Sequence, residues 1–192
     1  EHADEMGGDL FITMEYVDGE DLGSLLKRIG TLPQDKAIDV ARQLCAALAA
    51  AHEQGVLHRD LKPANVMLDG RGRVRLTDFG IAAIADEMDV EEPASGTPAY
   101  MAPEQYEGKE VSRRSDIYSL GLVLYELLTG RAAWGAKTFD DVRRLRTDHE
   151  RPPTLSSTNI AGLDPALAAL IDRCLDKDPG ERPASAFAVA AA

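Results

Sequence analysis

The chain of 192 residues is 44% apolar, which is enough to bury one core of ordinary domain size. Its formal charge of -12 and pI near 4.7 argue against a nucleic-acid or anionic-membrane binder, because both need surplus Lys and Arg. No apolar run approaches the ~18 residues that span a bilayer, and residues 1–9 lack the parts of a signal peptide. Cations and basic peptides are the expected partners, with no nucleic acid and no membrane contact.

The first third of the chain predicts one strand followed by two helices. Residues 10–17 form an apolar, partly β-branched run that ends at Asp18-Gly19, as a strand does. Residues 22–29 repeat apolar side chains every three or four positions and stop at Gly30, which predicts a short helix. A longer helix is predicted over residues 33–55, because a proline opens it and a glycine closes it.

A hairpin and a long loop are predicted next. The tetrapeptide at 69–72, Asp-Gly-Arg-Gly, favours a turn between short apolar runs at 66–68 and 74–77. Residues 81–102 show no periodicity, and the acidic run at 86–92 favours a solvated segment.

The last third of the chain predicts helices. Residues 117–128 are apolar on nearly every face, which is typical of a helix buried on all sides. Thr138 is expected to cap a later helix and Pro165 to open another. Cys45 and Cys174 lie in apolar helical patterns without a Cys or His at metal-ligand spacing, which predicts buried thiols in a reducing compartment.

Three short motifs carry the functional signal, and none is specific alone. They are His58-Arg59-Asp60-Leu61-Lys62-Pro63-Ala64-Asn65, Asp78-Phe79-Gly80 and Ala102-Pro103-Glu104. In this order, and separated by two short strands, they match the catalytic loop, the metal-binding motif and the end of the activation loop of protein kinases. The chain therefore resembles a protein kinase from about Leu10 to Ala188.

The resemblance implies a protein kinase-like fold of the α+β class, mostly α. Residues 1–19 would be the last strand of the small lobe and the hinge, and residues 20–192 the helical large lobe. The glycine-rich loop and the strand lysine that precede the hinge in this family are absent, so we expect a fragment of a longer kinase with negligible transferase activity alone. The alternative is a natural remnant that works as a non-catalytic, pseudokinase-like binding or scaffolding module. A glycine-rich loop in the upstream coding sequence would favour the enzyme.

The same resemblance assigns the residues of phosphoryl transfer. Its transition state spreads negative charge over phosphate oxygens, so positioning and electrostatic neutralisation supply most of the catalysis. Asp60 matches the general base, and Lys62 matches the cation that meets the transferring phosphoryl group. Asn65 and Asp78 would hold Mg²⁺, or Mn²⁺ in its place, against ATP. Thr97 stands where serine/threonine kinases place a threonine near the base, and the Asp-Leu-Lys-Pro-Ala-Asn context also favours that class.

Six residues resemble the adenine end of the nucleotide site. The hinge would pair with adenine through its backbone, an acid would reach the ribose, and apolar side chains would line the pocket: Met14, Glu15, Val17, Asp21, Met67 and Thr77. The alternative for Met14 and Met67 is a place in the core.

Supporting and regulatory roles follow from the same comparison. Asp116 resembles the aspartate that binds the catalytic-loop backbone, and Arg182 matches the arginine that pairs with Glu104. Arg59 is the family's usual partner for a phosphate on the activation loop, since guanidinium binds phosphate in bidentate fashion, and Ser95 is the candidate site of modification. The acidic run at 86–92 could replace that phosphate; an ordinary solvated loop is the alternative.

The remaining expectations concern histidines, partners and compartment. His52 and His58 are predicted to be hydrogen-bonded structural residues rather than proton shuttles. Protein substrates with Ser or Thr acceptors are expected, in the cytoplasm, either free or as the cytoplasmic domain of a membrane-anchored parent. Dimerisation of that parent stays open.

Overall fold

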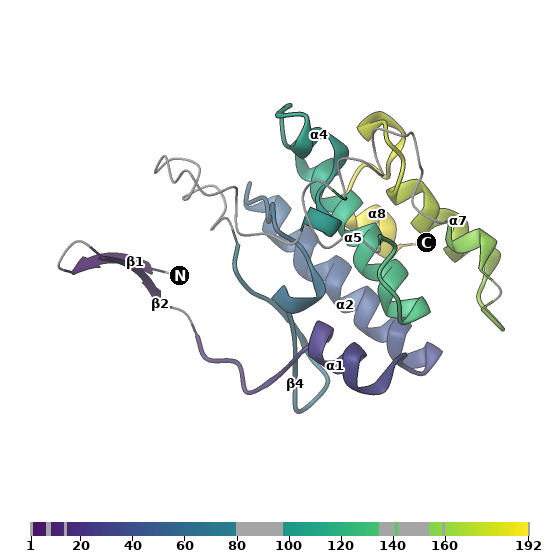
Figure 1. Cartoon of the computed structure of the whole chain (residues 1–192), viewed down its shortest axis with the longest axis horizontal. Coiled ribbons are helices and arrows are strands. Elements are labelled where there is room, and N and C mark those ends of the chain that lie inside the picture. The colour runs from purple at the N-terminus through teal and green to yellow at the C-terminus, as the bar shows by residue number, and fades with distance from the viewer. Residues whose placement is uncertain are drawn as a thin grey trace.

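The computed structural model describes residues 2–6, 9–13, 15–79, 98–134, 141, 154–158 and 160–191. This part of the chain is mostly helical and carries two small antiparallel sheets (Figure 1). None of the helices it contains is both long and apolar enough to cross a membrane.

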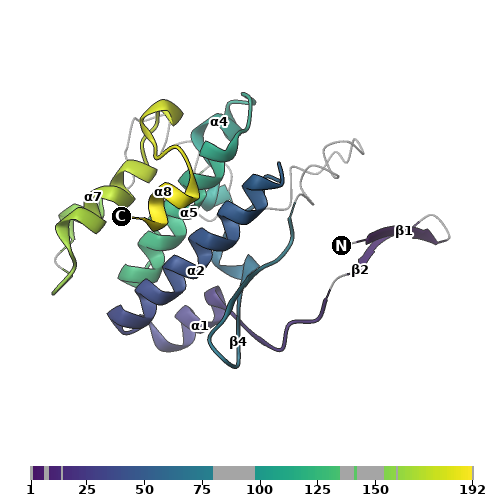
Figure 2. The same cartoon turned by 180° about the vertical axis from the view of Figure 1, so that it is seen from behind.

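The first sheet is a hairpin of β1 (His2–Met6) and β2 (Asp9–Thr13). It lies to one side of the helical body in both views (Figures 1 and 2). The predicted strand at 10–17 is therefore wrong in extent, and β1 was not predicted. Thr13 pairs with His2, the first residue of β1, so β1 has no residue left to pair with positions after Thr13. The Gly7-Gly8 pair between the two strands is a hairpin signal that could have revealed β1.

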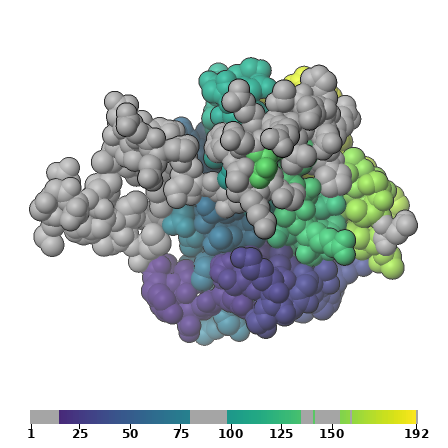
Figure 3. Space-filling model, in the orientation of Figure 1, coloured from purple at the N-terminus to yellow at the C-terminus, as the bar shows by residue number. Residues whose placement is uncertain are grey.

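The second sheet has the order β3-β4-β5, from β3 (Gly19–Asp21), β4 (Val66–Asp69) and β5 (Val74–Leu76). The predicted hairpin is confirmed by the antiparallel pairing of β4 with β5. β3 was missed because three residues are too few to show a strand pattern. Residues 15–30, in purple, follow one edge of the body beside this hairpin (Figure 3).

Two helices follow the first sheet as predicted. Helix α1 (Leu22–Ile29) begins after Asp21, whose carboxylate accepts a hydrogen bond from the Ser24 amide at 2.8 Å, and ends at Gly30 with φ of 83°. Helix α2 (Gln34–Glu53) buries one face, including Leu44 and Leu48, against the rest of the core.

Helix α5 (Arg113–Thr129) is the central element, and its predicted burial on all sides is confirmed (Figure 1). It packs against α2 on one side and α7 (Pro165–Cys174) on the other. The approach to α7 is close at Gly121, where an added Cβ would come within 2.8 Å of the Cys174 Cβ. Gly121 therefore sets the distance between these two helices.

The remaining described elements are short. They comprise two helices, α4 (Pro103–Tyr106) and α8 (Ala186–Ala190), and four 3₁₀ turns. The turns span Pro63–Asn65, Pro98–Tyr100, Leu155–Ser157 and Pro179–Glu181. Pro165 opens α7 as predicted, after Asp164 as its cap. The predicted cap Thr138 and the acidic run at 86–92 lie outside the described residues.

The main core joins α1, α2, α5, α7 and α8 to the β4–β5 hairpin. Cys45 and Cys174 are free and buried in it, as predicted, and burial raises the pKa of each thiol to about 12. Both thiols therefore stay protonated and unreactive at neutral pH.

Candidate active site

In the segment between α2 and β4, the side chains of Lys62 and Asn65 both bind the carboxylate of Asp60. The Lys62 ammonium lies 2.6 Å from Asp60 Oδ2, and the Asn65 amide nitrogen donates to the Asp60 backbone carbonyl at 2.9 Å and to Oδ2 at 3.3 Å. The Asp60 side chain is 26% exposed, whereas Asn65 is 4% exposed. The cluster thus has a buried side that fixes it and an open side that a reactant can reach.

The backbone of this loop is held by Asp116 in the first turn of α5. Asp116 Oδ2 accepts from the His58 amide at 2.8 Å, and Oδ1 accepts from the Arg59 amide at 2.9 Å. His52 of α2 also lies 2.8 Å from Oδ2 through its Nε2. Asp116 is 1% exposed, so these partners satisfy a carboxylate that would otherwise be costly to bury.

Two residues of the site have an unusual backbone conformation. Arg59 and Asp78, with φ of 65° and 62°, are the only residues other than glycine with positive φ in the described ranges. This conformation costs roughly 1–3 kcal/mol for such residues and persists only where the surroundings enforce it. Such strain concentrates at functional sites, so the backbone conformation indicates the same site as the sequence motifs, independently of the family resemblance.

Asp78 is brought next to the loop through its neighbours. The Thr77 amide donates to the Asn65 carbonyl at 3.0 Å, which extends the pairing of β4 with β5. The rings of Phe79 and His58 also contact each other, with centroids 4.6 Å apart. Asp78 therefore sits between two contacts to the segment that carries Asp60 and Asn65.

The donor set fits a magnesium ion. The Asn65 amide nitrogen is engaged by Asp60, so the amide oxygen is the atom free to bind a cation. The half-buried Asp78 side chain makes no ion pair or hydrogen bond to other described residues. One carboxylate and one amide oxygen are the hard ligands that Mg²⁺ prefers when substrate phosphates and water complete its shell.

A buried ion pair anchors α4 to the segment between α7 and α8. Arg182 binds Glu104 through Nη1 and Nη2, at 2.7 Å and 2.9 Å, and Ser115 of α5 donates to Glu104 Oε1 at 2.7 Å. Burial would raise the pKa of Glu104, but the hydrogen bonds from Arg182 and Ser115 outweigh it and lower the pKa below its ordinary value. Arg182 also lies over the Tyr118 ring, 4.9 Å from its centroid.

With this geometry in place, comparison with known proteins decides the family. The model of the protein kinase domain matches residues 3–191. The chain belongs to the protein kinase family. Its mostly helical body and three-stranded antiparallel sheet are accordingly those of a protein kinase domain.

Curated relatives of this kinase chain come from several bacteria. It is 41% identical to the serine/threonine-protein kinase pkn3 of Myxococcus xanthus, over 94% of the chain and 35% of the relative. It is 42% identical to the serine/threonine-protein kinase PksC of Streptomyces coelicolor, over 93% of the chain and 33% of the relative. It is 40% identical to the serine/threonine-protein kinase PknB of Mycobacterium leprae, over 94% and 29%. The chain thus spans about a third of the length of these relatives.

Only some of the residues expected at the adenine end of the site lie next to one another. The register places Asp21 and Arg75 on either side of Met67, and directly opposite residues in an antiparallel sheet project to the same face. One Asp21 oxygen caps α1, a structural contact that the sequence interpretation missed. Thr77 follows β5 and bonds to Asn65.

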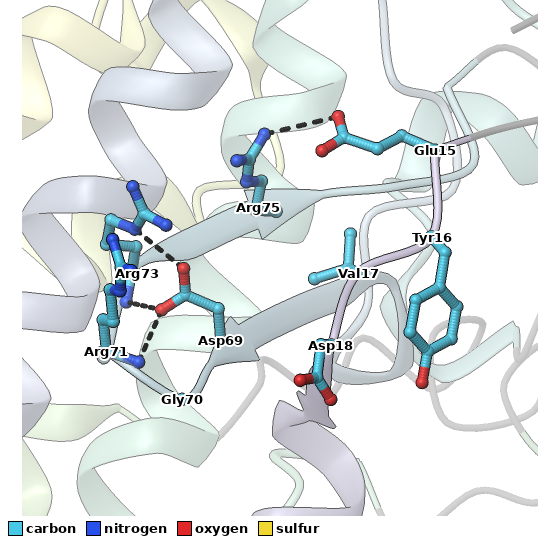
Figure 4. A pocket seen from close by; sticks show the side chains of 9 residues that line it. All are labelled: Glu15, Tyr16, Val17, Asp18, Asp69, Gly70, Arg71, Arg73 and Arg75. Atoms are coloured by element: carbon cyan, nitrogen blue, oxygen red, sulfur yellow. Dashed lines mark hydrogen bonds and ion pairs between the residues drawn. The ribbon is translucent and has the colours of Figure 1, made fainter.

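An open groove of about 340 Å³ borders this face (Figure 4). It contains Glu15 and Val17 of the expected hinge, but Asp21, Met67 and Thr77 are not among its lining residues. The rest of the groove is lined by Tyr16, Asp18 and the β4–β5 hairpin, and Glu15 forms an exposed ion pair with Arg75 at 3.6 Å. The groove therefore lies between residues 15–18 and the edge of the β4–β5 hairpin, and it is not the whole expected adenine pocket.

Several contacts of the candidate site had no signal in the sequence. Gln105, directly after the Ala-Pro-Glu motif, donates from its amide nitrogen to the Arg59 carbonyl at 2.9 Å. Ser119 of α5 donates to the Tyr100 carbonyl at 2.8 Å, and the Tyr100 hydroxyl binds Glu126. These contacts join positions 19 to 46 residues apart, so no local pattern could reveal them.

Some sequence expectations fall outside these observations or need correction. Met14, Ser95 and Thr97 lie outside the described residues. The expected hydrogen bonding holds for His52, but neither ring nitrogen of the buried His58 finds a partner among the described residues. Burial lowers the pKa of His58, so its ring is neutral and packs against Phe79 instead.

Proposed function

We propose that this chain is the catalytic-loop and metal-binding part of a protein kinase that transfers the γ-phosphate of ATP to Ser or Thr hydroxyls of proteins. The single observation that carries the proposal is the arrangement of Asp60, Lys62 and Asn65 around one carboxylate, beside the strained Asp78. The named relatives support the choice of serine and threonine acceptors.

Asp60 is the proposed general base. Its Oδ2 is occupied by Lys62 and Asn65, while Oδ1 has no hydrogen-bond partner in the described part of the chain. That oxygen can accept the proton of a Ser or Thr hydroxyl and aim the hydroxyl oxygen. The Lys62 ammonium, 2.6 Å from Asp60, stabilises negative charge on any oxygen that approaches the same place.

Asn65 and Asp78 are the proposed ligands of Mg²⁺ or Mn²⁺. When bound, ATP would supply the phosphoryl group and the metal would neutralise the charge that develops on it. Thr97 is proposed to act next to Asp60. For the adenine end we propose the six residues Met14, Glu15, Val17, Asp21, Met67 and Thr77.

The support and regulation of the site are proposed as follows. Asp116 orients the loop through two backbone amides, and the Arg182–Glu104 pair anchors the segment that ends the activation loop. Arg59 would bind a phosphate on Ser95. Residues 1–19 would be the last small-lobe strand and hinge, and residues 20–192 the large lobe, working in the cytoplasm where ATP is available.

Exchange of Asp78 for Asn tests the metal assignment. In the protein made from the complete coding sequence, D78N should abolish Mg²⁺-dependent transfer of labelled γ-phosphate to a Ser/Thr peptide, because a neutral amide is a weaker ligand than a carboxylate. Asn also tolerates positive φ, so the backbone at this position should be kept.

The matched control is D39N, the same exchange at an exposed position of α2. It should leave transfer unchanged and should unfold at the same temperature as D78N. Turnover by D78N equal to that of D39N would contradict the proposed site. No turnover by the unmodified protein, with ATP still bound, would instead favour a binding module.

A further inference from the structure

We propose that Gln105 is a positioning residue that fixes the peptide plane leading into Asp60, and so links α4 to the proposed base. The proposal rests on the proposed function for its catalytic consequence. It stands on a pair of hydrogen bonds: Gln105 Nε2 donates to the Arg59 carbonyl at 2.9 Å, and Oε1 accepts from the Ala102 amide at 2.8 Å.

The orientation of the Gln105 amide is fixed by these two partners. A backbone amide can only donate, so it must face Oε1, and a backbone carbonyl can only accept, so it must face Nε2. Turning the amide over would break both bonds. The donor to Arg59 is therefore set by the bond to Ala102.

Arg59 needs such support because of its conformation. It has φ of 65°, where a side chain with a Cβ is strained. Its amide is held by Asp116 Oδ1 at 2.9 Å and its carbonyl by Gln105 at 2.9 Å. Side chains from two separate helices thus hold both polar backbone groups of this one residue, which is the kind of enforcement that positive φ requires.

The held carbonyl matters because it belongs to the peptide unit that joins Arg59 to Asp60. A peptide unit is planar, so fixing its oxygen also fixes the direction of the Asp60 N–Cα bond. Asp60 in turn accepts hydrogen bonds from Lys62 and Asn65. Without the Gln105 bond, this peptide can rotate and shift the carboxylate from its productive position.

Gln105 is also well anchored on its own side. The preceding residue, Glu104, is 5% exposed and is bound by Arg182 at 2.7 Å. The hydrogen bond therefore runs from a rigid, buried anchor to the strained residue before the base, so movement of α4 would be felt at Asp60.

The substitution Q105E separates this role from simple capping of α4. A carboxylate still accepts from the Ala102 amide but cannot donate to the Arg59 carbonyl. In the protein from the complete coding sequence, Q105E should lower kcat about tenfold, the value of one lost hydrogen bond, with KM for ATP and peptide within about twofold. The control Q54E makes the same exchange at the exposed end of α2 and should leave kcat unchanged. An unchanged kcat in Q105E would overturn the proposal.

Hydrogen exchange gives a readout that does not depend on turnover. In Q105E the amides of residues 58–61 should exchange faster, while those of α2 keep their protection. Unchanged exchange at 58–61 would also overturn the role of Gln105. An unmodified protein without transferase activity would contradict the proposed function alone, and this comparison would still decide the role of Gln105.

Discussion

The side chains proposed to react and the side chains that support them are bonded in different ways. Glu104, Asp116 and Arg182 are at most 5% exposed, and each has several hydrogen-bond partners. Asp60 and Lys62 are 26% and 15% exposed, and Asp60 keeps one carboxylate oxygen free of described partners. The supporting groups use up their hydrogen-bonding capacity inside the protein, whereas the proposed base keeps one oxygen available, as the proposed function requires.

This difference implies that the two sets should fail in different ways when changed. Loss of a reactive group should remove turnover with little effect on folding. Loss of a supporting group should first destabilise the fold, because it leaves a buried charge without its partner.

The largest effect is expected at Asp60. Removing the proposed base with D60N should lower kcat by about 10²–10⁴-fold, since that is the usual contribution of a positioned base. The free energy of unfolding should stay near that of the D39N control, because Asp60 is partly exposed. Steady-state kinetics and urea unfolding on the same preparation test both parts, and a large loss of stability in D60N would contradict the division of roles.

The next largest effect is expected at Arg182. R182M leaves Glu104 buried without its cation and should cost about 3–5 kcal/mol of unfolding free energy. The control R28M removes an arginine from the exposed pair with Glu20 and should leave the unfolding midpoint unchanged. Urea unfolding of the two variants side by side measures the difference. Equal midpoints would show that burial does not determine how much each ion pair contributes to the free energy of unfolding.

The smallest effect is expected in the pH dependence of stability. The pKa of Glu104 is lowered, so its ionised form contributes stability that is present above its ordinary pKa of 4.5 and is lost as pH falls through the folded-state pKa. The stability difference between the unmodified protein and E104Q should therefore shrink as pH falls from 7 to 3 in urea titrations. A difference that grows toward acid pH would give the opposite sign and refute the assignment.

Periodicity and turn motifs predicted the local elements, whereas distant contacts were expected only through the family resemblance, as for Asp116 with the catalytic loop and Arg182 with Glu104. Helices α1, α2 and α5 were predicted because each repeats its apolar side chains within a few residues, and the β4–β5 hairpin because a turn tetrapeptide lies between two apolar runs. β3 was missed because it has three residues and pairs with the distant β4, and β1 was missed because the Gly7-Gly8 turn signal before β2 was overlooked.

The candidate site shows the same limit. Asp60, Asn65 and Asp78 could be named because they lie in short motifs, but the motifs do not state what holds them. Gln105 reaches Arg59 across 46 residues and His52 reaches Asp116 across 64, and such contacts leave no pattern in a single sequence. The positive φ of Arg59 and Asp78 is likewise imposed by tertiary contacts and not by residue type.

The most direct test of the proposed site is a crystal structure of the protein from the complete coding sequence with Mg²⁺ and a non-hydrolysable ATP analogue. We expect the metal to be bound by Asn65 Oδ1 and the Asp78 carboxylate at about 2.0–2.1 Å, with Asp60 free of the metal and facing the acceptor side. A metal bound by Asp60, or one that contacts neither Asn65 nor Asp78, would contradict the division between base and metal ligands.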